Sequence, residues 1–178
     1  MTAPTLQTRQ VAHVERDGPR KLAGLAAVYD RETSINGFRE RIARGAFERM
    51  LSTDAEVLAL ADHDPAKLLG RRSVGTLRLS DNGEGLGFEI DLPDTTAGRD
   101  VLALAERGDI GGMSFGFLIP KGGERMDDNV RVLTEIDLRE ISVVSAWPAY
   151  DGTQVEARDV PGGHPQRLMR HAIYSRWR

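Results

Sequence analysis

The 178-residue sequence contains no cysteine. This absence excludes disulfide bonds, a thiolate nucleophile and a cysteine-ligated zinc site, and it suits a reducing compartment. No apolar run reaches the roughly 18 residues that a membrane-spanning helix needs. The opening segment "MTAPTLQTRQVAHVERDG" lacks the basic-then-apolar order of a signal peptide. We therefore expect a cytoplasmic protein with no membrane partner.

The sequence also lacks an excess of positive charge. It has 24 Lys and Arg against 27 Asp and Glu, a formal net charge of -3, so we do not expect nucleic acid as the main ligand. Its 40% hydrophobic and 29% charged residues are typical of a soluble globular protein. We predict a polar N-terminal segment over 1–19, a globular domain over 20–158 and a basic C-terminal tail over 159–178. Met169, Ile173 and Trp177 recur every four residues, so the tail is either an amphipathic docking helix or a solvated terminus.

Hydrophobic periodicity predicts a mostly β domain with a few helices. The clearest hairpin lies in 73–94, where two alternating runs flank the turn "SDNGEG". A short helix is predicted in 95–109, with Thr95 or Thr96 as its N-cap and Gly108 as its stop. Further strands are expected in 21–30, 56–64, 113–120 and 130–150, a loop in 121–129, and mostly helical spacing interrupted by Gly45 in 38–52.

Ser114 is a candidate nucleophile within "GMSFG", a match to the G-x-S-x-G nucleophile elbow. In an elbow the serine ends a strand and opens a helix, whereas Phe115 and Phe117 alternate after Ser114 and predict that it begins a strand. An elbow hydrolase would also need a downstream histidine, and only His164 and His171 are available. The alternative is a small turn residue whose hydroxyl caps the backbone.

His63 is the better candidate for a general base, because it ends an apolar strand, whereas His13 lies in a polar stretch. A neutral imidazole accepts a serine proton and returns it to a leaving amine. Such a histidine requires an orienting group, and the candidates are Asp62, Asp64, Glu135, Asp137 and Glu140. The alternative is a strand-end histidine with no chemical role.

Among these acids, Glu140 stands out by its surroundings. Strict alternation in "EIDLREISVV" places Glu140 on one face with Ile136, Leu138, Ser142 and Val144. A carboxylate on an apolar face is costly unless it is paired. The partner is either a histidine N–H or, in a structural role, an arginine or backbone groups.

Four segments in order, "FRERIARGAF", "LALADHDPAKLLG", "GDIGGMSFGF" and "LREISVVSAWPAYDGT", resemble the phage prohead protease family, the capsid-maturation serine proteases of tailed phages. The resemblance covers about residues 20–157. It implies that Ser114 is the nucleophile and His63 the general base. It also implies Glu140 as the third member, since the family is similar in fold to the herpesvirus assemblins, whose third triad member lies on the strand after the serine strand. Many relatives carry Asn where this sequence has Asp62.

The resemblance implies an α+β, mostly β fold, with an antiparallel β-barrel surrounded by a few helices, as in the assemblins. It also implies peptide hydrolysis through an acyl-enzyme, with no metal and no organic cofactor. We place the oxyanion-hole donors among backbone N–H groups near 147–150, where Pro148 has none to offer.

The implied substrate is the scaffolding portion of the major capsid protein, together with the enzyme itself. The reaction would take place inside the immature capsid in the bacterial cytoplasm. We also expect the enzyme to form a homodimer or another self-associated form. Two alternatives stay open. One is a capsid-assembly or scaffold protein that keeps the fold without cleaving, and the other is an esterase-type hydrolase.

Overall fold

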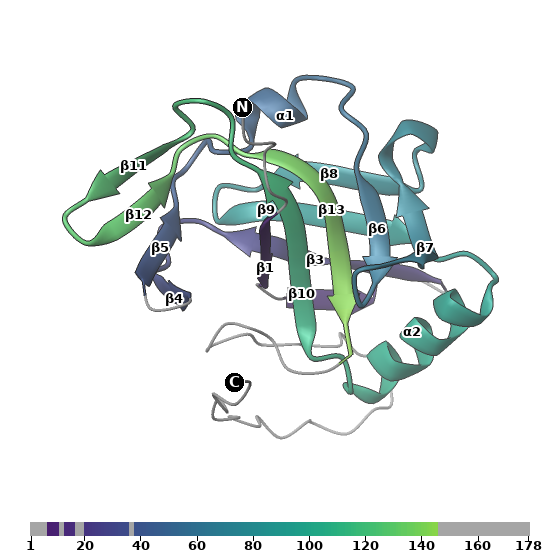
Figure 1. Ribbon diagram of the computed structural model, residues 1–178. Helices are drawn as coiled ribbons and strands as arrows, with labels where there is room; N and C mark the ends of the chain where they lie inside the picture. Colours follow the sequence, from purple (N-terminus) through teal and green to yellow (C-terminus); the bar gives the residue numbers. More distant parts are fainter. Residues whose placement is uncertain (1–6, 11–12, 17–19, 36–37, 146–178) are drawn as a thin grey trace.

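The computed structural model describes residues 7–10, 13–16, 20–35 and 38–145, and this part of the chain consists mainly of strands (Figure 1). The helical segments are α1 (Glu48–Leu51), α2 (Thr96–Arg107) and the 3-10 segment η1 (Arg72–Val74). The strands are β1 (Gln7–Gln10), β2 (His13–Arg16), β3 (Lys21–Val28), β4 (Thr33–Ile35), β5 (Phe38–Ile42), β6 (Leu58–Ala61), β7 (Asp64–Arg71), β8 (Leu77–Asp81), β9 (Gly85–Asp91), β10 (Gly112–Leu118), β11 (Glu124–Asp127), β12 (Val130–Leu133) and β13 (Asp137–Val144).

These strands form three sheets in the described residues. The five-stranded sheet has the order β1-β10-β13-β6-β7, and the four-stranded sheets have the orders β2-β3-β9-β8 and β11-β12-β5-β4. Neighbours are antiparallel except for β13 with β6 and β12 with β5, which are parallel. In Figure 1, β10, β13 and β6 run across β3, β9 and β8, while β11, β12, β5 and β4 project to one side. The fold is thus two packed sheets with a third extending from them.

The expected mostly β class with few helices is confirmed, but the expected antiparallel barrel is wrong because all three described sheets are open. The five-stranded sheet, for example, ends at β1 and β7. A barrel requires hydrogen bonds between its edge strands. At the β7 edge, Pro65 lacks an N–H, and the β6–β7 register slips between the pairs Leu60–Leu68 and Ala61–Asp64. Proline and irregular edges oppose further strand pairing.

The hydrophobic core lies between the five-stranded sheet and the sheet of β3, β9 and β8. Phe115 and Phe117 of β10 are fully buried, with ring centroids 5.3 Å apart, and Phe47 meets Phe115 edge-on at 6.3 Å. From the opposite sheet, Leu22 and Ile90 are also fully buried. Each such side chain stabilises the fold by about 1.5–3 kcal/mol relative to exposure. This core fixes the face of β10 that does not carry Ser114.

Helix α2 has the ends that its sequence predicts. The Thr95 side chain accepts a hydrogen bond from the Gly98 N–H, and Gly108 ends the helix in the left-handed region with φ +75°. Val101 and Ala105 pack into the core. The prediction of a capped short helix in 95–109 is confirmed.

The segment from Glu40 to Phe47 anchors the projecting sheet. Glu40 is only 2% exposed and lies 3.2 Å from Arg131 of β12, while Gly45 makes a turn with φ +80° and Phe47 enters the core. The expected short helix after Gly45 is present as α1, but Phe38–Ile42 is a strand and not part of a helical pattern. The parallel pairing with β12 outweighs the local spacing of apolar residues.

Some of the other predicted elements are confirmed, and others differ from the structure. The hairpin in 73–94 is confirmed as β8 and β9, and the strands in 21–30 and 56–64 appear as β3 and β6. The loop expected in 121–129 contains β11, and the strand expected from residue 130 is split into β12 and β13. Two strands, β1 and β2, lie in the segment 1–19. The predicted tail over 159–178 lies outside the described residues.

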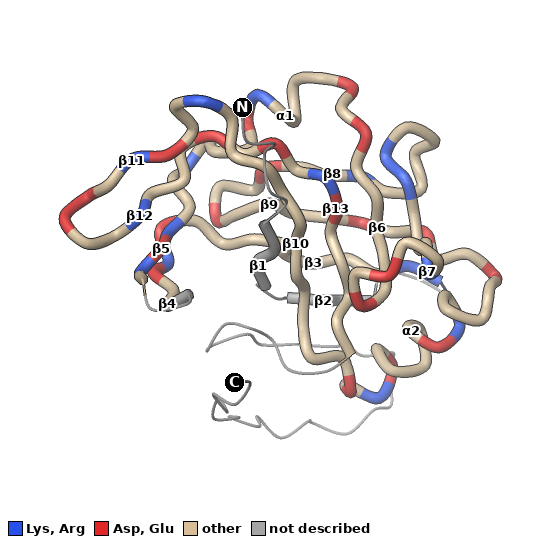
Figure 2. The backbone as a smooth tube through the Cα atoms, viewed as in Figure 1, with Lys and Arg blue, Asp and Glu red and all other residues tan. Residues whose placement is uncertain are grey.

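Charged residues of both signs are spread over the described chain (Figure 2). Strand β10 is free of charged residues along its whole length. Its burial explains this composition, since six of its seven residues are buried.

Candidate active site

His63 lies in a two-residue turn between β6 and β7. Ala61 pairs with Asp64, so Asp62 and His63 alone form the loop, and their φ angles are +50° and +57°. Two-residue hairpin loops with both φ values positive are usually built from Asn-Gly or Asp-Gly. Here neither residue is glycine, and left-handed conformations of this kind cost about 1–3 kcal/mol each unless the surroundings hold them.

The end of β13 holds this turn in place. The Asp62 N–H donates to the Val143 carbonyl (2.9 Å), and the Asp62 carboxylate accepts hydrogen bonds from the Ser145 N–H (2.8 Å) and hydroxyl (3.1 Å). The His63 N–H donates to Ser142 Oγ (3.3 Å). Both residues of the turn are therefore fixed by residues about 80 positions later in the chain.

A β-bulge on β13 directs Glu140. Gly116 pairs with Glu140, but the next residue, Phe117, pairs with Leu138, so Arg139 has no partner on β10. A bulge reverses the side-chain alternation and redirects neighbouring side chains. The strict alternation expected from the sequence is therefore wrong at this point. Leu138 lies in the core with Ile141 and Val143, and Glu140 lies on the opposite face with Ser142.

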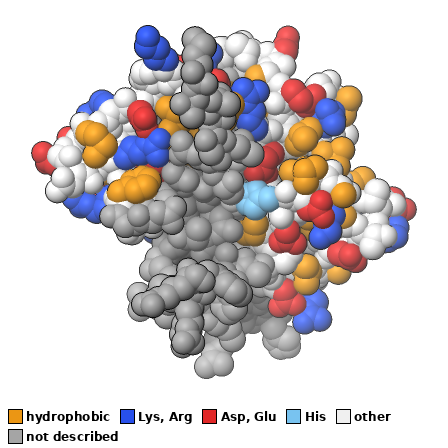
Figure 3. Space-filling model, viewed as in Figure 1, with side chains coloured by type: hydrophobic (Ala, Val, Ile, Leu, Met, Phe, Trp, Pro, Cys, Tyr) orange, Lys and Arg blue, Asp and Glu red, His pale blue; other side chains and the backbone are white. Residues whose placement is uncertain are grey.

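His63 and Glu140 form a direct contact on that face. His63 Nδ1 lies 2.8 Å from Glu140 Oε1, and Ser142 Oγ donates to Glu140 Oε2 at 2.5 Å. A carboxylate only accepts hydrogen bonds, so Nδ1 carries the proton, and Nε2 of the neutral ring keeps its lone pair. The histidine side chain is 31% exposed. Figure 3 shows histidine, in pale blue, at the surface of this face of the molecule, near acidic and hydrophobic side chains. The Nε2 atom of His63 is buried and has no hydrogen-bond partner among the described residues.

Ser114 lies one strand away from this pair. It is the third residue of β10, it is fully buried, and it stands directly opposite Ser142 in the β10–β13 ladder. Side chains of directly opposed residues share a face, with Cβ atoms about 4.5–5.5 Å apart. The register therefore brings Ser114 beside Ser142 and Glu140, and Ser114 lies within a strand, as its sequence context predicts.

Of the five acids that the sequence offers as orienting groups, Glu140 is the one in contact with the His63 ring. Asp62 binds Ser145, and Asp64 accepts from the Ala66 N–H (2.9 Å). Glu135 and Asp137 both pair with Arg49. Sequence reasoning missed Ser142, whose position two residues after Glu140 on the same strand was the available signal.

Several sequence candidates cannot be placed. The side chain of His13 and the residues His164 and His171 lie outside what the structure describes. The proposed oxyanion donors near 147–150 do so as well.

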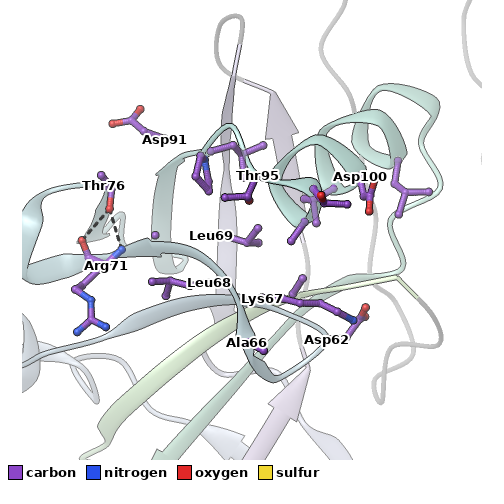
Figure 4. A pocket seen from close by; sticks show the side chains of 18 of the residues that line it. Asp62, Ala66, Lys67, Leu68, Leu69, Arg71, Thr76, Asp91, Thr95 and Asp100 are labelled. Carbon is purple, nitrogen blue, oxygen red and sulfur yellow. Dashed lines mark hydrogen bonds between the residues drawn. The ribbon is translucent and has the colours of Figure 1, made fainter.

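A groove of about 1170 Å³ begins at Ala61 and Asp62, directly before His63 in the chain. Leu68 and Leu69 of β7 form one wall, and the start of α2, with Thr95 and Asp100, forms the other (Figure 4). Its volume is slightly above the range of about 300–1,000 Å³ that is common for ligand sites. His63, Ser114 and Glu140 are not among its lining residues, so it adjoins the candidate site without containing it.

The described residues contain neither a metal-binding group nor a membrane-spanning helix. No group of three or more histidine and acidic side chains there is arranged to hold a metal ion. None of the helices in that part of the chain has the length and apolar character needed to cross a bilayer.

Comparison with known proteins identifies the family. No curated protein matches the sequence. Among solved structures, the bacteriophage T4 capsid assembly protease is similar in fold, with a TM-score of 0.55 and 14% sequence identity over 80% of this chain and 99% of that chain. A family model described as caudovirus prohead serine protease matches residues 5–163. Because this match spans most of the sequence, the chain belongs to the caudovirus prohead serine protease family.

Proposed function

We propose that this protein is a serine endopeptidase that removes the scaffolding portion of the major capsid protein, and also cleaves itself, inside the immature capsid in the host cytoplasm. Its family membership supports a capsid-maturation role. The observation that carries the catalytic assignment is the 2.8 Å contact between His63 Nδ1 and Glu140 Oε1, on the sheet face that Ser114 shares. In a catalytic triad a carboxylate orients a histidine, and the histidine takes the proton of the serine. The contact between His63 and Glu140 supports these roles for Glu140, His63 and Ser114.

In the first half of the reaction, Ser114 Oγ attacks the carbonyl carbon of the scissile peptide bond while His63 Nε2 takes the hydroxyl proton. Glu140 accepts the Nδ1 proton in a hydrogen bond and stabilises the imidazolium ion that forms. His63 then returns the proton to the leaving amine as the C–N bond breaks. The product is an acyl-enzyme in which Ser114 carries the N-terminal part of the substrate, while the C-terminal fragment leaves with its new free amine.

In the second half, a water molecule takes the place of the amine. His63 Nε2 accepts a proton from the water as its oxygen attacks the acyl carbon, and then gives that proton to Ser114 Oγ. The ester bond breaks, and the carboxylic acid product leaves. Ser114 and water supply the two nucleophiles, and His63 carries out every proton transfer. The proposed reaction therefore needs no cofactor.

One observation bears on access to the site. Ser114 is fully buried and His63 Nε2 is also buried. A peptide can reach these atoms only after a displacement uncovers them. The same burial favours a second function, a capsid-assembly protein of this fold that does not cleave, and the experiment must separate the two.

The test is co-expression with the major capsid protein of the same phage, comparing wild type with Ser114→Ala by intact mass spectrometry of both chains. We expect shortened capsid protein, and shortened enzyme, only with the wild type. Ser80→Ala is the matched control, because Ser80 is an exposed serine on β8 in a different sheet.

Each outcome has a distinct meaning. Cleavage that depends on Ser114 supports the protease, and the fragment masses locate the cleavage sites. Equal cleavage with Ser114→Ala overturns the assignment of Ser114 as nucleophile. Capsids that assemble without any cleavage in either strain support the assembly function instead.

A further inference from the structure

We propose that Ser142 is a positioning residue for the His63–Glu140 pair and that Gly116 provides the space in which the Glu140 carboxylate is held. The inference rests on the proposed function, since it concerns how the general base is oriented. Neither residue is one of the three assigned to the triad.

Ser142 contacts both members of the pair. Its hydroxyl donates to Glu140 Oε2 at 2.5 Å and accepts from the His63 N–H at 3.3 Å. A hydroxyl has one proton to donate and two lone pairs to accept with, so both bonds form together. Ser142 is fully buried, so no solvent replaces these bonds when they are lost.

These contacts close a ring of interactions. The His63 imidazole binds Glu140 Oε1, the other oxygen Oε2 binds Ser142, and Ser142 binds the His63 backbone. With Oε2 occupied by the serine, the carboxylate is turned so that Oε1 faces Nδ1. Ser142 thus fixes both the acceptor of the ring proton and the backbone from which the ring projects.

Gly116 stands opposite Glu140 at the bulge. A Cβ atom at Gly116 would lie 2.5 Å from Glu140 Oε1 and 3.2 Å from its Cδ and Cγ atoms. Oε1 is the oxygen that binds His63. Gly116 is not among the described glycines with positive φ, so its backbone accepts alanine, and the three atoms nearest to the added Cβ all belong to the Glu140 side chain.

The chemical consequence concerns the imidazole tautomer. A carboxylate oxygen at Nδ1 keeps the proton there and leaves Nε2 free to accept the serine proton. If the carboxylate turns away, the ring proton distributes between the two nitrogens and the ring orientation relaxes. Displacements of about 1 Å in catalytic groups reduce rates by about 10²-fold.

The experiment measures the rate at which a fluorophosphonate probe labels Ser114 in the full chain, together with kcat and KM on a peptide spanning a mapped cleavage site. We expect Ser142→Ala to lower the labelling rate and kcat by about 10- to 100-fold with KM nearly unchanged. Ser142→Thr keeps the hydroxyl and should restore most of the rate. Gly116→Ala should lower the rate to a similar degree, and Gly87→Ala on β9, another strand glycine without positive φ, is its matched control.

A second readout does not depend on activity. Nitrogen-15 NMR of the His63 ring reports which nitrogen carries the proton. We expect a single tautomer protonated at Nδ1 in the wild type, and loss of that preference in Ser142→Ala and Gly116→Ala.

The outcomes separate the two proposals. If wild type is neither labelled nor able to cleave while the NMR changes appear as expected, the proposed function fails and the positioning role stands. If the variants keep the wild-type tautomer and the wild-type rate, the positioning role is overturned whatever the substrate is. If Ser142→Ala does not fold, Gly116→Ala and Ser142→Thr still decide the question, because a tautomer unchanged in Gly116→Ala contradicts the proposal.

Discussion

The carboxylate of Asp62 binds both the backbone N–H and the hydroxyl of Ser145, so the turn that presents His63 is attached to the end of β13. This attachment offsets the strain of two consecutive residues with positive φ. The stability of the turn is therefore open to a direct test.

We expect Asp62→Ala to destabilise the protein by about 1–3 kcal/mol, since it removes two hydrogen bonds and places alanine in the left-handed region. Asp62→Asn should remain close to wild type, because asparagine tolerates this conformation and keeps an acceptor oxygen. Asp62→Gly relieves the strain but loses the contacts and should fall between the two. Urea unfolding measures all three, and equal stability of the Ala and Asn variants would contradict this account of the turn.

Replacing Glu140 with Gln keeps the shape of the side chain and removes its charge. If the amide oxygen faces Nδ1, the imidazolium ion loses its counter-charge, and if the amide nitrogen faces Nδ1, the wrong tautomer forms. In either case we expect kcat to fall by about 10²- to 10⁴-fold. The check is the cleavage rate of the mapped peptide, with circular dichroism to verify folding. Asp137→Asn, which changes an acid that pairs with Arg49, is the matched control and should retain the rate.

For Gly98 in α2, we expect alanine to change the stability of the protein in the direction opposite to the one that helix propensity predicts. Alanine in place of a helical glycine normally stabilises by about 1 kcal/mol. Here a Cβ atom would lie 2.1 Å from the Pro93 carbonyl oxygen, which is backbone and cannot swing away. We expect Gly98→Ala to destabilise the protein by about 1–3 kcal/mol, as overpacking does.

Thermal unfolding measures this effect. The control is Ala103→Gly at an exposed position of the same helix, which should cost about 1 kcal/mol through propensity alone. A higher melting temperature for Gly98→Ala would show that the Pro93 backbone moves aside.

The ion pair between Arg78 and Asp91 predicts a pH dependence. Hydrogen bonds from Arg78 hold the pKa of the Asp91 carboxyl below its ordinary value. The folded protein therefore binds this proton less readily than the unfolded chain, so the stabilisation is present above the unfolded pKa of about 3.9 and is lost as the pH falls through the lower, folded pKa. Both side chains are 41% exposed, so solvent and salt weaken the effect.

Urea midpoints from pH 7 to pH 2 measure it. We expect wild type to lose more stability below pH 4 than Asp91→Asn does, with a smaller difference in high salt. Parallel curves for the two proteins at low salt would contradict the assigned cause.

Local signals in the sequence were sufficient where a residue's neighbours in the chain decide its structure. The alternation around "SDNGEG" and the caps at Thr95 and Gly108 predict β8, β9 and α2 correctly. The position of His63 at the end of an apolar run likewise predicts a histidine at the end of a strand, and His63 lies in the turn after β6. The contact between Glu140 and His63 was one of two alternatives that the sequence left open.

Partners distant in sequence decided the rest. Arg139 has no partner on β10 because the pairing register of β13 with β10 shifts there. The two-residue alternation within one strand carries no information about that register. The strand at Phe38–Ile42 forms through parallel pairing with β12. Whether a sheet closes into a barrel depends on whether its two edge strands pair with each other, and in the described residues they do not. The turn at Asp62 and His63 lacks the glycine that marks such hairpins, so its left-handed geometry had no local signal.

The turn also sets an order of events during synthesis. Its two strained residues are held by Ser142, Val143 and Ser145, which leave the ribosome about 80 residues after the turn itself. Until β13 is made, nothing in the ladder joins β10 to β6, and the candidate base and nucleophile have no common scaffold. A nascent chain that stops short of this strand is therefore without a working site. Under the proposed function, the late addition of this one strand delays proteolysis until β13 has been made.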